Sequence, residues 1–167
     1  MGELSQVRNS QHVDAPPEVL WPFVWNAELR PEWEVGVRAV KDVHGPLDEV
    51  GGTWTEVRKA PFGRSFEAGV TVKTVEPLRL WEVTGLLPAG PGKLHHVVRH
   101  TLEPEGDGTR KVVTSTFELH GFMSGLVERL ILKPLIQRHS NRCERNLRAL
   151  AERATRERSE ETAAPDP

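Results

Sequence analysis

The stretch from Val13 to Trp25 constrains the fold more than any other, because a strand gives way to a helix there within three residues. Pro16 and Pro17 suit a helix start, where a missing N–H group costs little. Asp14 is expected to accept hydrogen bonds from the first helical turn. Two short helices are predicted, over residues 16–26 and 28–34, and the first has apolar residues at helical spacing: Val19, Leu20, Phe23 and Val24.

Alternating apolar and polar residues, punctuated by Gly and Pro turns, predict seven strands. Their expected ranges are 5–13, 35–44, 53–59, 64–75, 79–86, 93–103 and 110–120. Short connections between consecutive strands favour an antiparallel sheet, so the fold class is α+β. A long amphipathic helix follows from about Ser124 to Arg158, with Pro134 as either a kink or a break. We expect one domain over residues 1–158 and a disordered polar tail over 159–167.

Two motifs in this order carry a resemblance to a known family. Val13-Asp14-Ala15-Pro16-Pro17-Glu18-Val19-Leu20-Trp21 leads into the helix pair, and Gly106-Asp107-Gly108-Thr109 forms a late hairpin turn. Over residues 5–155 the chain resembles the SRPBCC/START-like superfamily, of the polyketide cyclase/dehydrase and lipid-transport type. The resemblance implies a helix-grip fold, in which a curved seven-stranded antiparallel sheet wraps around the C-terminal helix and encloses a ligand cavity. It does not identify the ligand.

Composition narrows the class of partner. Lys plus Arg is 22 and Asp plus Glu is 24, so nothing in the net charge suggests a nucleic acid. The single Cys143 excludes an intrachain disulfide and fits a reducing compartment. No apolar run approaches the roughly 18 residues of a membrane span, and the N-terminal residues lack the pattern of a signal peptide. We therefore expect a cytoplasmic protein without integral membrane association, and the oligomeric state stays open.

Strand parity predicts which side chains line the cavity. In the sixth strand, the face that carries His96, Val98 and His100 is otherwise apolar. Parity is ambiguous for the fifth strand, and the resemblance favours Trp81 and Val83 as inward-facing. The full expected lining is Phe66, Trp81, Val83, His96, Val98, His100, Phe117, Ile136 and His139.

The histidines are the main candidates for chemistry. His96, and with it His100 and His139, could orient a carbonyl or exchange protons, and His96 is the leading candidate for a catalytic acid or base. The plainer interpretation is a core histidine that is satisfied by the backbone. His139 and Cys143 are spaced to share a metal, but no Cys-x-x-Cys or His-Glu-x-x-His pattern is present, so we predict neither a metal nor a cofactor.

The aromatic and basic residues divide into separate roles. Trp21 and Trp33 are predicted to anchor the packing, Trp54 to face outward or lie at the sheet edge, and Trp81 to stack on a ligand. The arginines of the last helix are predicted to form a solvated face, and a role at a membrane surface would also need an exposed apolar face. They are Arg138, Arg142, Arg145, Arg148 and Arg153.

Three functions fit these patterns. The first is a carrier or sensor that binds a hydrophobic molecule, such as a lipid, an isoprenoid or an aromatic polyketide. The second is an enzyme of the cyclase/aromatase type, in which His96 acts as acid or base while Ser115 or His100 positions a carbonyl; the chain has no Tyr, so no tyrosine hydroxyl takes part. The third, implied by the resemblance, is a partner of other proteins, such as a quinone-pathway chaperone. The volume and lining of the cavity would discriminate among them.

Overall fold

The computed structural model describes residues 5–59, 64–89, 92–120, 126 and 128–163. Its elements follow the predicted order. The chain forms β1 (Ser5–Val13), α1 (Pro17–Trp25), η1 (Ala27–Leu29), α2 (Arg30–Trp33), β2 (Val37–His44), β3 (Thr53–Lys59), β4 (Ser65–Glu76), β5 (Leu80–Ala89), β6 (Gly92–Glu105), β7 (Gly108–His120), the π-helical turn η3 (Glu128–Leu132) and α4 (Lys133–Ala163).

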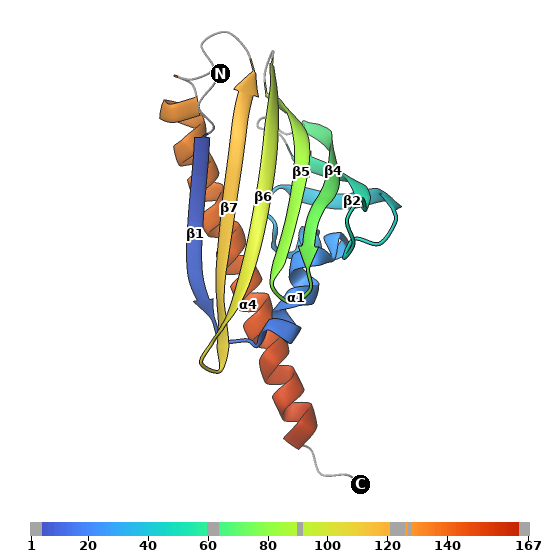
Figure 1. Ribbon diagram of the computed structural model, residues 1–167, viewed down its shortest axis with the longest axis vertical. Helices are drawn as coiled ribbons and strands as arrows, with labels where there is room; N and C mark the ends of the chain where they lie inside the picture. Colours follow the sequence, from blue (N-terminus) through green and yellow to red (C-terminus); the bar gives the residue numbers. More distant parts are fainter. Residues whose placement is uncertain (1–4, 60–63, 90–91, 121–125, 127, 164–167) are drawn as a thin grey trace.

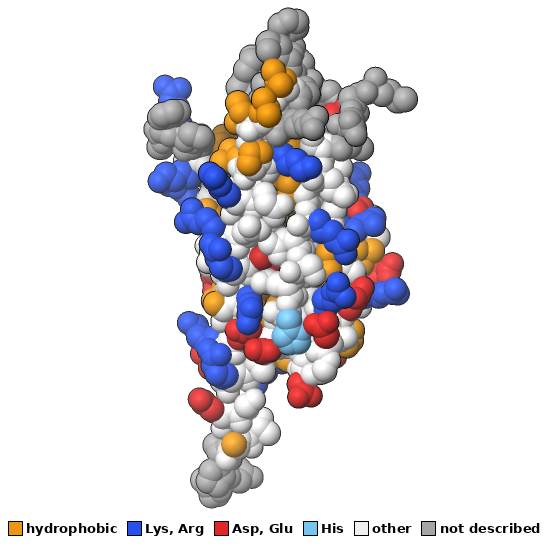
Figure 2. Space-filling model, turned by 90° about the vertical axis from the view of Figure 1, so that its left-hand side faces the viewer, with side chains coloured by type: hydrophobic (Ala, Val, Ile, Leu, Met, Phe, Trp, Pro, Cys, Tyr) orange, Lys and Arg blue, Asp and Glu red, His pale blue; other side chains and the backbone are white. Residues whose placement is uncertain are grey.

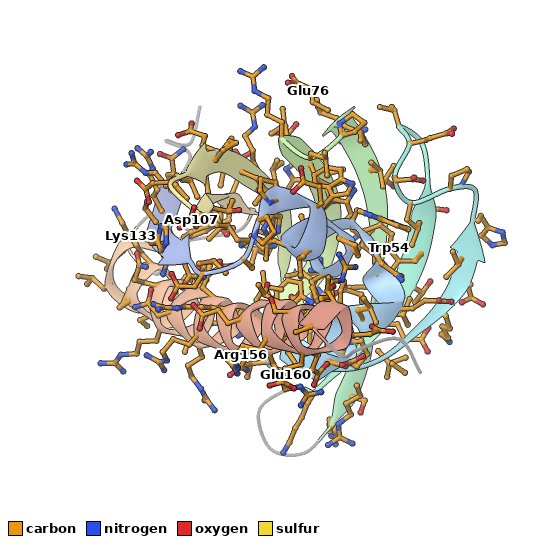
Figure 3. All side chains as sticks on the ribbon, turned by 90° about the horizontal axis from the view of Figure 1, so that it is seen from below. Trp54, Glu76, Asp107, Lys133, Arg156 and Glu160 are labelled. Atoms are coloured by element: carbon orange, nitrogen blue, oxygen red, sulfur yellow. The ribbon has the colours of Figure 1, made fainter. Side chains whose placement is uncertain are left out.

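All seven strands join one antiparallel sheet in the order β1-β7-β6-β5-β4-β3-β2. Figure 1 shows α4 crossing behind this sheet, and the view from below shows the strands arching over the helix, with α1 between them (Figure 3). Helix α4 packs along β1, at one edge of the sheet, and against α1 and α2. The predicted helix-grip fold is confirmed. None of the described helices is both long and apolar enough to cross a bilayer.

The predicted role of Asp14 as a helix cap is wrong. The N-cap position of α1 is Pro16, in an extended conformation with no side-chain cap bond. Asp14 lies two residues earlier. Its carboxylate Oδ1 is 3.0 Å from His12 Nε2, and its backbone N–H donates to the Glu152 carboxylate on α4 at 3.1 Å. The start of the first helix is therefore tied to the last helix.

Pro134 is the second residue of α4 and follows directly on η3. Because η3 runs directly into α4, the N–H that Pro134 lacks is one that would bond back into η3, so Pro134 marks the place where the π-helical turn changes to the α-helix. The expected start near Ser124 lies outside the described residues. At the other end α4 continues to Ala163, so the tail expected to be disordered over residues 159–167 is helical as far as Ala163. That extension contains Glu and Ala and no Gly or Pro, which suits a helix.

The interior contains two apolar clusters. The larger joins α1, the middle of the sheet and the second half of α4, and it contains the buried Trp21 and Trp33, which act as packing residues as predicted. The smaller contains Val7, Leu94 and Phe117, with Leu132 and Ile136 packed against them. Polar side chains lie on the concave face beside these clusters, and the candidate site is built from them.

A buried ion pair joins α4 to the sheet. The Lys111 ammonium on β7 contacts the Glu144 carboxylate on α4, and both side chains are buried. Gln11 on β1 donates from its side-chain amide to the backbone carbonyl of Glu144 at 2.9 Å and to its carboxylate at 3.1 Å. Burial lowers the pKa of Lys111, and the charge of Glu144 opposes that change. Polar side chains of β1, β7 and α4 thus converge under the helix.

Replacing Lys111 with Ala should reduce the free energy of unfolding by about 3–5 kcal/mol, because it leaves the Glu144 carboxylate buried without a counterion. The double variant Lys111→Met, Glu144→Leu should lose less than Lys111→Ala alone, since no charge is then left unpaired. Denaturant unfolding measures both. Arg148→Ala is the control, because its ion pair with Glu152 is exposed and contributes at most about 1 kcal/mol. A double variant less stable than Lys111→Ala would contradict this account.

Candidate functional site

The predicted inward face of the fourth and fifth strands is confirmed. Ala68, Val70 and Val72 of β4 are buried on the concave side, and Phe66 is half-buried. Trp81 and Val83 of β5 are also buried, which resolves the ambiguous parity of that strand. These side chains form one wall of the interior.

Trp54 was predicted to face outward or to lie at the sheet edge, and both are wrong, since β3 lies between β4 and β2. Its side chain is only 2% exposed, and its ring stacks on Trp81 with centroids 5.8 Å apart and planes 13° apart. The Trp81 indole N–H donates to the backbone carbonyl of Leu47 at 2.9 Å. The Trp81 ring is therefore held both by stacking on Trp54 and by its hydrogen bond to Leu47. The two stacked rings form a continuous aromatic wall across β3, β4 and β5.

Arg30, which the sequence analysis did not select, lies against this wall. Its guanidinium carbon is 5.3 Å from the ring centre of Trp33 and 5.9 Å from those of Trp54 and Trp81. A guanidinium at such distances from a ring face is stabilised by cation–π attraction. The side chain is buried although it carries a full charge, so it needs anionic partners as well.

Two carboxylates supply that charge. Arg30 forms ion pairs with Glu34, one turn further along the chain, and with Glu56 of β3, where Nε and Oε1 are 2.8 Å apart. Arg58 Nη1 lies 2.9 Å from Glu34 and 2.5 Å from Glu56, while the Trp54 indole donates to Glu56 at 3.1 Å. We call Arg30, Glu34, Glu56 and Arg58 the charge network.

The charge network sets the ionisation of its members. Burial alone would raise the pKa of Glu34, but the charges of Arg30 and Arg58 outweigh it and hold that pKa at about 2. Two guanidinium groups and two carboxylates then leave the network neutral overall. The sequence contained a signal for two members of the charge network, because Glu56 and Arg58 share one face of β3 with Trp54.

The three candidate histidines all lie on the inner side. His100 is buried, His96 and His139 are half-buried, and burial lowers the pKa of each. For His96 the pKa falls to about 4, so the ring is neutral at neutral pH. The charges of Glu34, Arg58 and Arg30 act on both His96 and His139, which places these two rings beside the charge network.

Several buried nitrogens on this face have no hydrogen-bond partner among the described residues. Four belong to uncharged rings: Nε2 of His96, Nδ1 and Nε2 of His100, and Nε1 of Trp33. The others are Nε and Nη1 of Arg30, whose guanidinium is ion-paired with Glu34 and Glu56. The His100 ring lies between two tryptophans, with centroids 5.9 Å from Trp81 and 6.4 Å from Trp33. Buried polar atoms are almost always hydrogen-bonded in folded proteins, so these four ring nitrogens need an ordered water or another polar group as a partner.

Cys143 is inert in this setting. Its sulfur lies 3.4 Å from His139 Nε2 and accepts from the Val35 backbone N–H at 3.3 Å. Burial raises the pKa of the thiol to about 12, so it is neither a thiolate nucleophile nor a ready metal ligand. Within the described part of the chain, no three His, Cys, Asp or Glu side chains form a group that could hold a metal.

The remaining predicted lining residues divide between the two apolar clusters. Val98 packs against the larger cluster, whereas Phe117 and Ile136 belong to the smaller.

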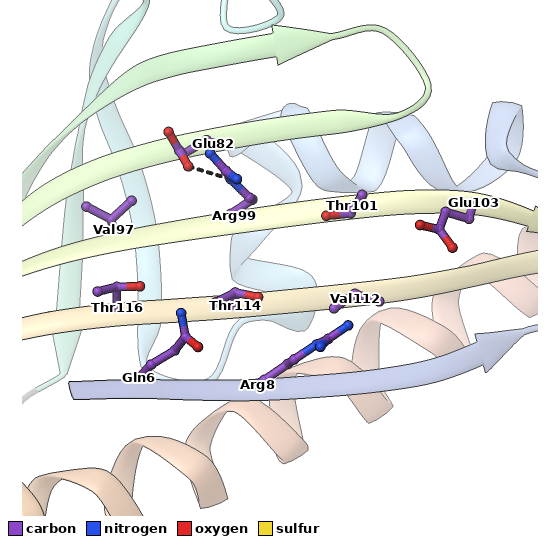
Figure 4. Close-up of a pocket in the computed structure, with 10 residues that line it drawn as sticks. All are labelled: Gln6, Arg8, Glu82, Val97, Arg99, Thr101, Glu103, Val112, Thr114 and Thr116. Atoms are coloured by element: carbon purple, nitrogen blue, oxygen red, sulfur yellow. Dashed lines mark hydrogen bonds and ion pairs between the residues drawn. The ribbon is translucent and has the colours of Figure 1, made fainter. Parts of the chain in front are cut away.

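Two hollows of about 430 Å³ each lie elsewhere. One is on the outer face of the sheet, among Arg8, Arg99, Thr114 and their neighbours (Figure 4), and the other is beside Arg156 of α4. Neither is lined by a predicted residue, and a single internal cavity that joins all of them stays a prediction.

The buried histidines predict how stability depends on pH. A histidine whose pKa is lower in the folded state than its ordinary 6.5 takes up protons more readily when unfolded. The free energy of unfolding should therefore fall as the pH drops from about 6.5 toward 4. Glu34, whose pKa is lowered, adds a loss only below its ordinary value of 4.5. Urea unfolding at a series of pH values measures this.

Matched variants test whether the buried histidines cause this pH dependence of the free energy of unfolding. His96→Gln should flatten the decline between neutral and mildly acidic pH, because one buried titrating ring is removed. His95→Gln should keep the wild-type profile, since that neighbouring ring is exposed on the outer face and bonds to Thr84. Equal profiles for His96→Gln and the wild type would show that His96 is not the group responsible.

Comparison with known proteins gives the family. The model for polyketide cyclase/dehydrase and lipid-transport proteins matches residues 5–155, whereas no curated protein matches the chain. Protein MLL2253 from Mesorhizobium loti is 21% identical, with a TM-score of 0.67 over 89% of this chain and 98% of its own. Ara h 8.0201 is 14% identical, with a TM-score of 0.68 over 89% and 98%. The di-domain ARO/CYC StfQ of the steffimycin pathway is 13% identical, with a TM-score of 0.74, and the chain covers 51% of it. With 151 consecutive residues matched by the family model, this chain belongs to the polyketide cyclase/dehydrase and lipid-transport family.

Proposed function

We propose that the protein binds an uncharged, mainly apolar small molecule between α4 and the concave face of the sheet, as a carrier or sensor. The observation that carries this proposal is the set of unpartnered nitrogens of His96, His100 and Trp33 on a wall of tryptophan and aliphatic side chains. Ligand sites in proteins combine such walls with a few fixed polar groups. A ligand oxygen would satisfy nitrogens that otherwise have no partner.

The ligand should be uncharged because the buried charges balance. Arg30 and Arg58 are paired with Glu34 and Glu56, and Lys111 is paired with Glu144. The histidines beside them are neutral at neutral pH, since burial lowers the pKa of each. A carboxylate or phosphate on the ligand would be desolvated without a free counterion. A ketone, phenol or alcohol oxygen can accept from Trp33 and exchange hydrogen bonds with a neutral imidazole.

The spacing of the histidines suggests an elongated ligand. His96 and His100 are four residues apart on β6, so their backbones lie about 13 Å apart along the strand. Trp33 and the aromatic wall lie near His100, while His139 and Glu34 act on His96. A molecule several rings long, or a comparable chain with an oxygen at each end, would contact both places.

Binding is favoured over catalysis by the state of His96. A general acid or base works best with a pKa near the working pH, and burial lowers the pKa of His96 to about 4. At neutral pH this ring holds no proton to give as an imidazolium, and it is a weak base. The cyclase/aromatase alternative would need the bound substrate to raise that pKa. It rests on the family and on the fold shared with the ARO/CYC protein.

The first test compares two adjacent histidines. His96→Leu should weaken binding of a neutral apolar ligand that carries a carbonyl group by about fivefold, the range of one hydrogen bond, because a fixed polar contact is lost. His95→Leu should leave binding unchanged, since His95 lies on the outer face. Titration followed by tryptophan fluorescence measures both. Equal losses in the two variants would remove His96 from the site.

The second test compares ligands that differ in charge. N-phenyl-naphthylamine and anilinonaphthalene sulfonate share one aromatic skeleton, but only the second carries a sulfonate. The neutral probe should bind more tightly, because the balanced interior offers no free cation to the anion. Fluorescence titration of both probes gives the comparison. Tighter binding of the sulfonate would contradict an uncharged ligand class.

A further inference from the structure

An exposed apolar surface lies where η3 joins α4. Leu126, Leu130, Ile131 and Leu135 are 55%, 64%, 60% and 58% exposed. We call these four residues the leucine patch. Single exposed apolar residues are common, but four large ones within ten consecutive residues form a surface that usually has an occupant. Figure 2 shows hydrophobic side chains gathered toward this end of the molecule.

Basic side chains continue from the leucine patch along the same helix. Between Leu130 and Arg142 the sequence has three basic residues and no acidic one. Steps of three and four place Ile131, Leu135, Arg138 and Arg142 on one stripe, with the arginines about 4.5 Å and 10 Å beyond Leu135 along the axis. Both arginines are exposed. In Figure 2 a column of Lys and Arg side chains runs along the α4 side of the molecule.

We propose that the leucine patch and the arginines beside it dock on the surface of a bilayer that contains anionic phospholipids. Apolar side chains of an interfacial helix enter the headgroup region, while basic residues next to them attract anionic headgroups. Charge complementarity selects this occupant, because the sequence from Leu130 to Arg142 contains three basic residues and no carboxylate. The arginines alone fit a solvated face; the exposed apolar residues beside them complete the pattern of a membrane-surface helix.

The proposal does not depend on what binds inside. Vesicles contact the outer side of η3 and α4, whereas the proposed ligand lies on the concave face of the sheet. A protein that binds the neutral probe but not vesicles would refute docking alone. A protein that binds vesicles but not the probe would refute only the interior site.

The test uses the full chain with vesicles of phosphatidylcholine, alone or mixed with phosphatidylglycerol. We expect flotation with the mixed vesicles, weaker association with pure phosphatidylcholine, and release as the salt concentration rises. Equal association with both vesicle types at all salt concentrations would overturn the role of charge. No association with either would overturn the proposal.

Variants locate the surface. Leu130→Glu with Ile131→Glu should abolish flotation, whereas Val43→Glu with Val50→Glu, at exposed apolar positions elsewhere, should retain it. Arg138→Glu with Arg142→Glu should weaken association by at least about fivefold per charge removed, and the control Arg38→Glu with Arg64→Glu should not. Circular dichroism checks that each variant is folded. Equal effects in test and control pairs would overturn the assignment.

A second copy of the chain is the competing occupant. Sedimentation of the wild type and of Leu130→Glu with Ile131→Glu distinguishes the two. A wild-type dimer that becomes a monomer in the variant, without vesicle binding by either, would assign the leucine patch to self-association and refute bilayer docking.

Discussion

The Arg30 guanidinium, held between three tryptophan rings and two carboxylates, is the interaction on which the interior depends. It joins the short α2 helix to the tryptophans of β3 and β5. It also sets the charge of its surroundings, because Glu34 remains ionised beside it despite burial. Burial lowers the pKa of the neighbouring histidines, so their rings are neutral at neutral pH and serve as donors or acceptors rather than charges.

Three polar contacts hold α4 on either side of the space between helix and sheet. Lys111 and Glu144 connect α4 to β7 near one edge, and Cys143 and Asn146 of α4 bond to the backbone beside α2 on the other side, at Val35 and Trp33. The helix backbone packs along β1 and against α1 and α2, so β3 to β6 are faced mainly by side chains. Large aromatic residues and a few polar groups fill that region.

The two faces of helix α4 have different surroundings: one packs against the rest of the protein and the other is exposed to solvent. The inner face contributes His139, Ser140, Cys143 and Glu144, which are buried or half-buried against β1, β7 and α2. The outer face contributes exposed arginines, which follow the exposed leucines of η3. One helix therefore borders both the interior of the sheet and the outer surface of the molecule.

Local patterns in the sequence determined the element order, the two motifs of the family, the ranges of β1 and β3, and the inward face of β4. Each of these features follows from an alternation of period two, a turn or a proline, and all three depend only on residues that are close together in the sequence. Tertiary structure alone decided the burial of Trp54, the charge network and the unpartnered nitrogens. Arg30, Glu34, Glu56 and Arg58 are typical surface residues in sequence, and they are buried only because the fold brings α2 to β3 and supplies each charge with its counterion. A charged side chain can be buried when the fold brings a counterion from a distant segment of the chain. A local pattern in the sequence does not show which distant segment that is.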